Sequence, residues 1–241
     1  MLAAVFLAGA IQAAPCPQFF ADGIAPMVEV DQQICFTGFS VGYRASWGEP
    51  VWSAEELTPD SVKAGEADKR NGEFHKCDEL PADEQISPDV YRDSGFDLGH
   101  MTPAGDRGAD KPETFGTCNM VPQRPELNRI VWDGLETSLR DLATTGDTLY
   151  VVTGPEVDIT PQTLGGKIMV PSSTWKAVYD VTKDAAGAWT CTNVSTPVCH
   201  QETIEALGEQ IGFDPMPGAS SVMKSQPFVL PTPNKGAEDV Q

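Results

Sequence analysis

Three neighbouring segments indicate the fold of this chain: DLGHMTPAGD (97–106), FGTCNMVPQRPELN (115–128) and RIVWDGLETSLR (129–140). Residues 90–99 include β-forming side chains and lead into a Gly-His pair, which predicts a strand that presents His100 at an exposed turn. Residues 102–114 are rich in Pro, Gly and Asp, and they predict a loop. Residues 115–121 can form a return strand that ends at Pro122, because proline cannot donate to a sheet ladder.

A helix is expected from Pro125, which suits a first turn, to Gly146, which suits a helix end. Apolar residues recur along it at spacings of three or four and predict one buried face: Leu127, Val131, Leu135, Leu139 and Leu142. A second stripe lies one position further on, about 100° around the helix: Asn128, Trp132, Glu136 and Arg140. The polar members of this stripe can face a cleft, whereas we expect Trp132 to pack.

Such a cleft would combine an imidazole, an amide oxygen, a carboxylate and a guanidinium. Magnesium suits this set, because Mg²⁺ prefers hard oxygen ligands, keeps several waters and takes few protein groups together with substrate phosphate. A neutral imidazole can take a proton from water, and an arginine can hold phosphate in a fork. The pattern therefore favours metal-assisted hydrolysis of phosphodiesters.

The same residues resemble the DNA/RNA non-specific endonuclease family, the ββα-metal nucleases related to endonuclease G. The resemblance rests on DLGHM with PAGD behind it, on CNMVPQ, on Leu127-Asn128 and on the W..LE pattern of 132–136. Weaker similarity runs from about Cys35 through VVTGP (151–155) to KIMVPSSTWKAVYD (167–180). The resemblance implies an α+β protein with the ββα-metal nuclease fold, in which helices flank a central, mostly antiparallel β-sheet.

The resemblance also implies a role for each polar residue of the cleft. His100 would be the general base, and Asn128 would be the only direct protein ligand of Mg²⁺, for which Mn²⁺ could substitute. Glu136 would hold metal-bound water. Asn119 would be a further polar residue of the active site.

Arginines would bind the substrate phosphate. The resemblance implies this role for Arg140 and, on a looser match of the DKRNGEF segment, for Arg70. Leu98 stands where the family usually has arginine, between the Asp and the Gly of the motif. One cation is therefore missing, and Arg107, just past the motif, is the residue that could partly replace it.

Several of the candidate site residues also have a purely structural interpretation. Asn128 could be a helix cap, since asparagine caps helices well. Glu136 and Arg140 have the spacing of an ion pair on a helix surface. Asp97 and Asp106 could be turn formers instead of site residues.

The formal net charge of −19 is unusual for an enzyme that binds nucleic acid, because most of the affinity for phosphate comes from cations. More than half of the Lys and Arg residues lie between Lys69 and Arg140, although more acidic residues lie there too. We therefore expect a local basic cleft on an acidic body. Acidity alone also has a simple interpretation, which is solubility.

The first residues and the cysteines indicate export. Residues 1–13 (MLAAVFLAGAIQA) are apolar and end in small residues, like a secretion signal that lacks its basic start, and they are too short to cross a membrane. We therefore expect a secreted or periplasmic protein without membrane insertion. Six cysteines then favour disulfides, and many pairings are open. The spacing favours Cys191–Cys199 and Cys16–Cys35, which leaves Cys77–Cys118.

The expected protein is a single nuclease domain over residues 14–230, followed by a flexible tail over 231–241. Its expected function is Mg²⁺-dependent, non-specific endonuclease activity on DNA and RNA. Two alternatives are a phosphodiesterase of the same fold that acts on other phosphodiesters, and an inactive relative that binds nucleic acid. The sequence leaves open whether the chain forms a homodimer or has a protein inhibitor.

Overall fold

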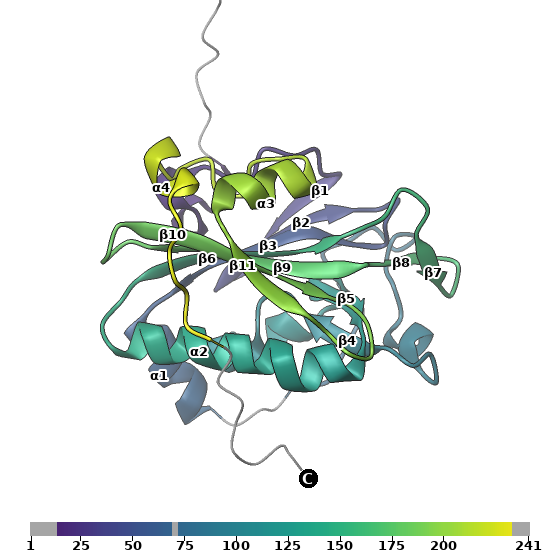
Figure 1. Ribbon diagram of the computed structural model, residues 1–241. Helices are drawn as coiled ribbons and strands as arrows, with labels where there is room; N and C mark the ends of the chain where they lie inside the picture. Colours follow the sequence, from purple (N-terminus) through teal and green to yellow (C-terminus); the bar gives the residue numbers. More distant parts are fainter. Residues whose placement is uncertain (1–13, 69–71, 233–241) are drawn as a thin grey trace, which may run out of the picture.

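The computed structural model describes residues 14–68 and 72–232, and its centre is a seven-stranded antiparallel sheet (Figure 1). In spatial order the strands are β1 (Gln32–Cys35), β2 (Phe39–Arg44), β3 (Glu49–Leu57), β6 (Leu149–Glu156), β9 (Ser173–Asp180), β10 (Ala185–Thr192) and β11 (Cys199–Glu202). Two smaller antiparallel pairs are β4 (Asp97–His100) with β5 (Met120–Gln123), and β7 (Gln162–Leu164) with β8 (Ile168–Val170). The predicted α+β class with a central antiparallel sheet is confirmed.

Helices cover both faces of the sheet. Those below it are α1 (Pro59–Ala67) and α2 (Asp133–Thr144), and those above it are α3 (Ile204–Ile211) and α4 (Ser221–Ser225), as Figure 1 shows. α1 begins at a capping box, because the Thr58 hydroxyl accepts from the Ser61 backbone N–H and the Ser61 hydroxyl accepts from that of Thr58. Short 3₁₀ turns connect the elements: Pro17–Phe19, Ala21–Gly23, Pro88–Tyr91, Ala104–Asp106, Lys111–Phe115 and Thr117–Asn119.

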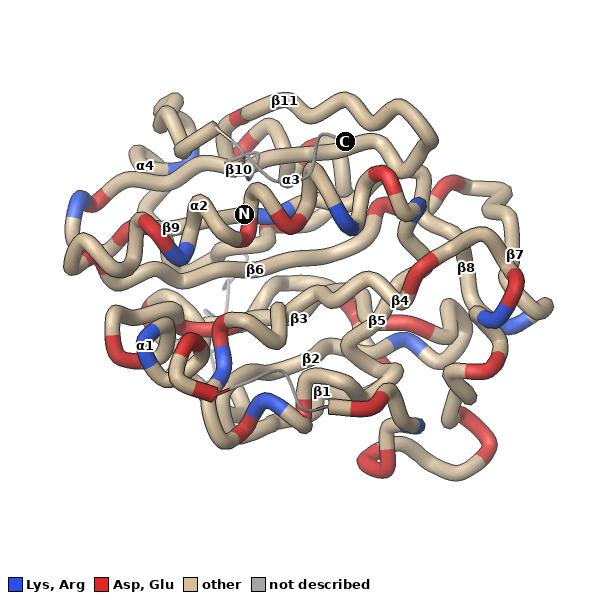
Figure 2. The backbone as a smooth tube through the Cα atoms, turned by 90° about the horizontal axis from the view of Figure 1, so that it is seen from below, with Lys and Arg blue, Asp and Glu red and all other residues tan. Residues whose placement is uncertain are grey.

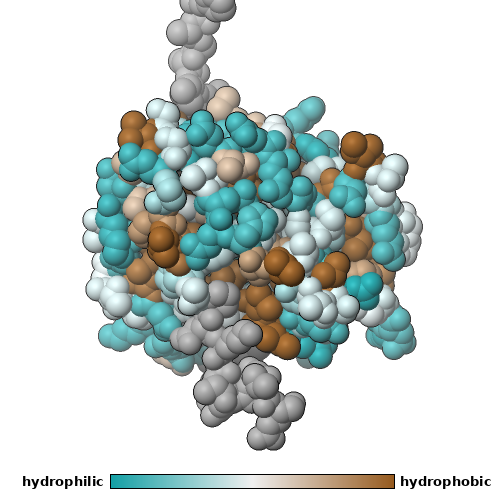
Figure 3. Space-filling view, viewed as in Figure 1, coloured by the Kyte–Doolittle hydropathy of each residue, from teal (hydrophilic) through white to brown (hydrophobic). Residues whose placement is uncertain are grey.

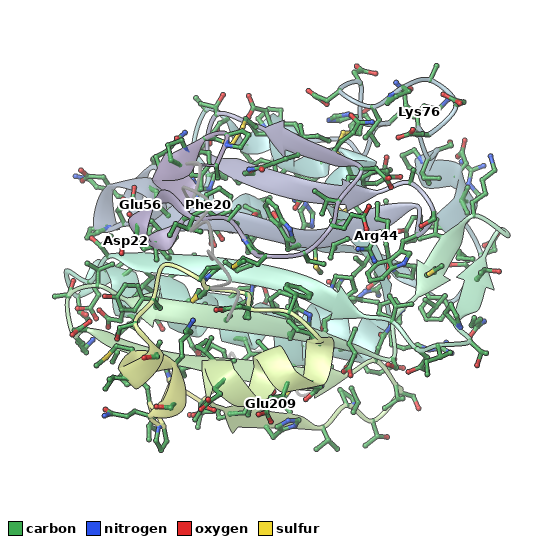
Figure 4. All side chains as sticks on the ribbon, turned by 90° about the horizontal axis from the view of Figure 1, so that it is seen from above. Phe20, Asp22, Arg44, Glu56, Lys76 and Glu209 are labelled. Atoms are coloured by element: carbon green, nitrogen blue, oxygen red, sulfur yellow. A yellow bond between two sulfur atoms is a disulfide. The ribbon has the colours of Figure 1, made fainter. Side chains whose placement is uncertain are left out.

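The upper face of the sheet buries an apolar core against α3 and the N-terminal turns. Trp52 and Trp175 are buried there, together with Leu207 of α3. The ring of Phe20 meets that of Trp52 edge-on, with centroids 5.5 Å apart, and Figure 4 views this side of the molecule. Burial of one large apolar side chain contributes about 1.5–3 kcal/mol, so this layer is a major source of stability.

The lower face packs against the helix that the sequence predicts from Pro125. Its first part, Leu127–Trp132, is a π-helical turn, and α2 continues it. Leu127, Leu135 and Leu139 are buried, as predicted. Val131 and Leu142, also predicted to be on the buried face, are only partly buried.

Because of the π-helical turn, the residues that share a helix face with Asn128 differ from those predicted. The backbone N–H of Asp133 donates to the carbonyls of Asn128 and Ile130, so the next residue on the face of Asn128 is five positions on instead of four. Asp133 therefore takes the place predicted for Trp132. Trp132 is turned into the core, where it is 1% exposed, and its expected packing role is confirmed.

The return strand lies later in the chain than predicted. β5 includes Pro122, which lies opposite Leu98 of β4, whereas residues 117–119 form a 3₁₀ turn. The prediction that Pro122 ends the strand is wrong. In a two-stranded ladder, alternate N–H groups of each strand point outward, so a proline at such a position loses no ladder hydrogen bond.

The favoured disulfides are all present: Cys16–Cys35, Cys77–Cys118 and Cys191–Cys199. The third joins opposite residues of β10 and β11, and the first ties the N-terminal segment to β1. Disulfides of this kind typically stabilise a fold by about 2–4 kcal/mol, mainly by restricting the unfolded chain.

The two ends of the chain fall largely beyond the described part. The predicted signal, 1–13, and all but the first two residues of the predicted tail, 231–241, lie outside the described residues. Within residues 14–68 and 72–232, no helix is long and apolar enough to cross a membrane. Figure 3 shows that hydrophilic residues cover most of the face seen in Figure 1, with hydrophobic residues in separate spots.

Candidate functional site

A cleft with a volume of about 840 Å³ lies between the end of β4 and the helix that includes α2. Figure 2 views this side of the molecule, where the β4–β5 pair lies near one end of the helix. The polar residues on its walls include His100, Asn128, Arg129, Asp133, Glu136 and Arg140. The fold thus brings together four of the predicted site residues, from a strand, a π-helical turn and an α-helix.

His100 is the last residue of β4 and lies opposite Met120 of β5. Its ring meets that of Phe115 edge-on at 5.1 Å and lies 5.6 Å from that of Phe74, measured between centroids. These contacts fix the imidazole on the cleft wall, where the residue is partly exposed although its Nε2 atom is buried. A partly exposed imidazole can exchange a proton with water, which is the chemistry that the predicted general base requires.

Asn128 lies within the helix, which begins at Pro125, and its backbone N–H donates to the carbonyl of Arg124, so the helix-cap interpretation is wrong. Its Nδ2 donates to Oδ2 of Asp97 at 3.1 Å. A carboxylate can only accept a hydrogen bond, so this contact fixes which end of the amide is oxygen. Asn128 lines the cleft, and its Oδ1 atom is the kind of hard oxygen ligand that a divalent cation prefers.

Glu136 lies about two helical turns beyond Asn128 on the same wall, and it is partly exposed. Desolvation raises the pKa of its carboxyl group to about 8, although the charges of Lys176 and Arg140 lower it. A carboxylate that is costly to ionise is stabilised strongly by a nearby cation. The donor set of Asn128 and Glu136 therefore fits a divalent metal ion.

Arg140 is held in place by the PAGD segment. Its Nη1 donates to Oδ1 of Asp106 at 2.8 Å, and its Nη2 donates to the hydroxyl of Thr137 at 2.9 Å. Desolvation alone would lower the pKa of Arg140, but Asp106 and Glu136 raise it overall. A Cβ atom on Gly105 would lie 2.9 Å from Nη1, so glycine makes room for the guanidinium. The observed ion pair of Arg140 is with Asp106, which acts as more than a turn former.

Arg107 does not line the cleft, and the prediction that it replaces the cation missing at Leu98 is wrong. Its side chain is 6% exposed and forms an ion pair with Glu55 of β3. Its Nη2 also donates to the backbone carbonyl of Glu56 at 3.2 Å. Desolvation raises the pKa of Glu55 to about 8, against the opposing effect of Arg107. The guanidinium therefore compensates a buried carboxyl group instead of meeting substrate.

Asn119 does not reach the cleft either, contrary to the prediction, because it is fully buried. Its Oδ1 accepts from the backbone N–H of Thr102 at 3.0 Å. Its Nδ2 donates to the carbonyls of Thr102 and Thr114, at 2.9 and 3.0 Å. Asn119 thus joins the two ends of the loop between β4 and β5, and it supports the site from behind.

The prediction of a local basic cleft is wrong, because acidic and basic side chains line the cleft together. Three ion pairs lie on or next to its walls: Arg92–Asp89, Arg129–Asp97 and Arg140–Asp106. Figure 2 shows acidic and basic residues close together on this side. A phosphate that binds here must compete with carboxylates. Arg70, the other predicted phosphate contact, lies outside the described residues.

A second group of side chains has the spacing of a metal site within the described part of the chain. It consists of Cys77, Glu79 and Cys118. The two sulfur atoms are joined in a disulfide, so neither can offer the thiolate that binds metal. This group is therefore excluded, and the oxygen ligands of the cleft are the better fit.

Arg129 is a cleft residue that the sequence analysis missed. Its Nε and Nη2 donate to the two carboxylate oxygens of Asp97, at 2.8 and 2.6 Å. Asp97 thereby contacts both Arg129 and Asn128, so it positions other side chains and is more than a turn former. The sequence offered one indication of this role, since Arg129 directly follows Asn128. In a regular helix, however, Arg129 would lie about 100° away from the polar stripe that includes Asn128 and Glu136.

Comparison with known proteins agrees with this geometry. Residues 22–220 match the family described as DNA/RNA non-specific endonuclease. A nuclease of Nostoc sp. is 37% identical over 153 residues, which cover 62% of this chain and 54% of the relative. Nuclease C1 of Cunninghamella echinulata is 34% identical over 142 residues, which cover 53% and 56%. This chain therefore spans about half the length of these curated relatives.

The structural comparison points to the same fold. A chain of the crystal structure of the EndoG/EndoGI complex superposes with a TM-score of 0.68 and 25% sequence identity, covering 77% of this chain and 85% of that one. Bovine mitochondrial endonuclease G is also 36% identical over 108 residues, which cover 44% of this chain and 36% of the relative. Because the family match covers most of the sequence, this chain belongs to the DNA/RNA non-specific endonuclease family and has its ββα-metal nuclease fold.

Proposed function

We propose that this protein is a metal-dependent endonuclease that hydrolyses phosphodiester bonds of DNA and RNA, with Mg²⁺ as the metal and Mn²⁺ as a substitute. The observation that carries the proposal is the hydrogen bond from Asn128 to Asp97. It orients the amide of Asn128, which lines the same cleft as Glu136 and His100. Membership of the endonuclease family supports the same activity.

The side chains of the cleft divide the chemistry between them. Asn128 and Glu136 would hold the cation, and Glu136 would have to be ionised to do so. His100 takes a proton from the water that attacks phosphorus. Arg140 donates to a non-bridging phosphate oxygen, and Arg70 is the second predicted donor. A bound divalent cation supplies Lewis-acid stabilisation of the negative charge that develops on the phosphate.

Little sequence preference is expected from this set of residues. The groups described in the cleft are suited to phosphate oxygens, which carry no sequence information. Because Arg129 and Arg140 already pair with carboxylates, affinity for nucleic acid should be modest and should fall as salt rises.

We infer that the protein is exported to the periplasm or the medium as a single nuclease domain over residues 14–230. Support comes from the apolar segment 1–13 and from the three disulfides, which suit an oxidising compartment.

A phosphodiesterase that acts on other phosphodiesters is the second candidate. It is favoured by the net charge of −19 and by Leu98, which removes a cation from the cleft. One assay separates the candidates: plasmid DNA, RNA and bis(p-nitrophenyl) phosphate are incubated with the protein in Mg²⁺, in Mn²⁺ and in EDTA, with His100→Ala as control.

The proposed function predicts that Mg²⁺ or Mn²⁺ supports cleavage of plasmid and RNA, that EDTA abolishes it, and that His100→Ala nearly abolishes it. Undiminished cleavage in EDTA would exclude the metal mechanism. Cleavage of the small diester alone would establish the second candidate. Binding of nucleic acid without any cleavage would identify an inactive relative.

A further inference from the structure

Arg129 is the most exposed cation next to the proposed metal ligand. It follows Asn128 in the π-helical turn, lines the cleft, and has a side chain that is 68% exposed. Asp97 accepts from both residues: its Oδ2 from Nδ2 of Asn128, and its two oxygens from Arg129. The carboxylate therefore fixes the guanidinium of Arg129 beside the amide of Asn128.

The geometry of this ion pair leaves part of the guanidinium available. Nε and Nη2 of Arg129 each donate one hydrogen to Asp97, which is a side-on fork. A guanidinium carries further N–H groups on Nη1 and Nη2, along its outer edge. That edge matches two oxygens of a phosphate, and the fork restricts the side chain before substrate arrives.

We propose that Arg129 binds a phosphate of the substrate next to the metal site. It thereby supplies the positive charge that Leu98 does not, a role that rests on the proposed nuclease function. Leu98 packs with Tyr91 and Leu164 in an apolar cluster, and Arg107 is committed to Glu55. Arg129 is thus the cation whose outer edge and position both suit a phosphate held beside Asn128.

The other described cations of the cleft are placed differently. Lys111 is buried, and its Nζ donates to the carbonyls of Gly65 and Asp68 at the end of α1. Arg140 is only 17% exposed. Arg92 is 74% exposed and pairs with Asp89 within its own turn, so it resembles Arg129 in exposure and pairing but has no described contact with Asn128 or Asp97. Arg92 is therefore the matched control.

The test compares Arg129→Gln, Arg129→Lys and Arg92→Gln with the wild type. Binding of a fluorescent duplex oligonucleotide is measured in EDTA, where no cleavage is expected, over a range of salt. Arg129→Gln should weaken binding about tenfold or more, the usual size for a lost hydrogen bond to a charged group, and should lower the salt slope by about one phosphate contact. The affinity of Arg129→Lys should lie between those of the wild type and Arg129→Gln, because lysine keeps the charge but cannot form the two-nitrogen fork. Arg92→Gln should change binding by less than about twofold.

A second measurement, the Mg²⁺ concentration for half-maximal cleavage, separates binding from positioning. If Arg129 acted only through Asp97 on Asn128, Arg129→Gln would raise this concentration and leave binding in EDTA unchanged, which would overturn the proposal. Equal losses for Arg129→Gln and Arg92→Gln would overturn it as well. If the wild type binds the duplex but cleaves nothing in Mg²⁺, the nuclease function fails, while the binding comparison still decides the role of Arg129.

Discussion

The two faces of the central sheet differ although the same strands build them. On the upper face, Trp52, Ala54 and Trp175 pack into an apolar core. The neighbouring positions Glu55 and Lys176 point to the lower face, and both are buried and ionisable. Only the lower face lies behind the cleft. Both faces therefore stabilise the fold, and the lower face also places ionisable groups behind the site.

The charged face carries a cost that its contacts partly offset. Desolvation lowers the pKa of Lys176, against the opposing effect of Glu136 and Glu55. Its Nζ donates to the hydroxyl of Thr153 at 2.8 Å and lies 5.0 Å from the ring centroid of Trp132. Buried ionic groups are often no more stable than apolar replacements. Glu55 and Lys176 lie on the face behind the cleft, which is consistent with a role in supporting it.

The largest expected effect is on the rate, from a residue of the cleft. His100→Ala should lower kcat/KM on plasmid DNA by about 10² to 10⁴, the usual contribution of a general base. The melting temperature should stay within a few degrees of the wild type, because His100 is partly exposed. Activity and melting are measured on the same preparation. A loss of activity that unfolding fully explains would give His100 a structural role.

The next effect is on stability, from the apolar face. Trp175→Ala should lower the free energy of unfolding by about 3–5 kcal/mol, because a fully buried aromatic ring is removed. At a temperature where the variant is still folded, its kcat/KM should remain near that of the wild type. Denaturant unfolding and a cleavage assay test this pair of values. A large loss of activity in the folded Trp175→Ala variant would mean that the upper face of the sheet also contributes to catalysis.

The third effect is on the pH dependence of stability without metal. Desolvation raises the pKa values of Glu55 and Glu136 to about 8, above their ordinary value of 4.5. Between the ordinary pKa and the raised pKa, the two carboxyl groups stay protonated in the folded protein but are ionised in the unfolded chain. The unfolded state therefore gains stability relative to the folded state as pH rises, and the free energy of unfolding should fall from about pH 5 to pH 8. Melting temperatures in EDTA over this range measure the slope.

A matched variant assigns this slope to the charged face. Glu136→Gln cannot ionise, so the fall in stability with pH should become smaller. Some slope should remain, because burial also raises the pKa values of Glu49 and Glu55. Trp175→Ala should keep the full slope. An unchanged slope in Glu136→Gln would show that this carboxyl group ionises normally in the folded protein.

The smallest effect concerns Leu98. Leu98→Arg should raise kcat/KM by up to about tenfold if the new guanidinium reaches phosphate, less the loss of apolar packing. If Arg129 already supplies positive charge there, the gain should be larger in an Arg129→Gln background than in the wild type. A double-mutant cycle on duplex DNA measures the difference. Equal gains in both backgrounds would show that the two positions act independently.

The sequence predicts those parts of the molecule that depend on local pattern. Spacing of apolar residues predicts the helix after Pro125. The Gly-His pair correctly predicts where the strand ends, at His100, but the predicted start is wrong: the strand begins only at Asp97, and Pro88–Tyr91 form a 3₁₀ turn. These features depend on neighbours within a few positions, so the chain itself carries the information.

Features that depend on distant contacts could not be predicted in this way. The π-helical turn moves Trp132 into the core and brings Asp133 and Arg129 to the cleft, but regular helical spacing does not reveal it. Arg107 is buried because Glu55, on a strand far away in sequence, needs a partner. Asn119 joins two loop ends whose proximity only the folded chain creates.

We expect the Asn128 side of the cleft to hold one catalytic divalent cation. Electron paramagnetic resonance measures Mn²⁺ binding without any cleavage assay, in the wild type and in Asn128→Ala. One Mn²⁺ should bind tightly per wild-type chain, and its affinity should be at least about tenfold lower in Asn128→Ala, with Arg92→Gln like the wild type. Unchanged Mn²⁺ affinity in a folded Asn128→Ala variant would show that Asn128 does not hold the cation.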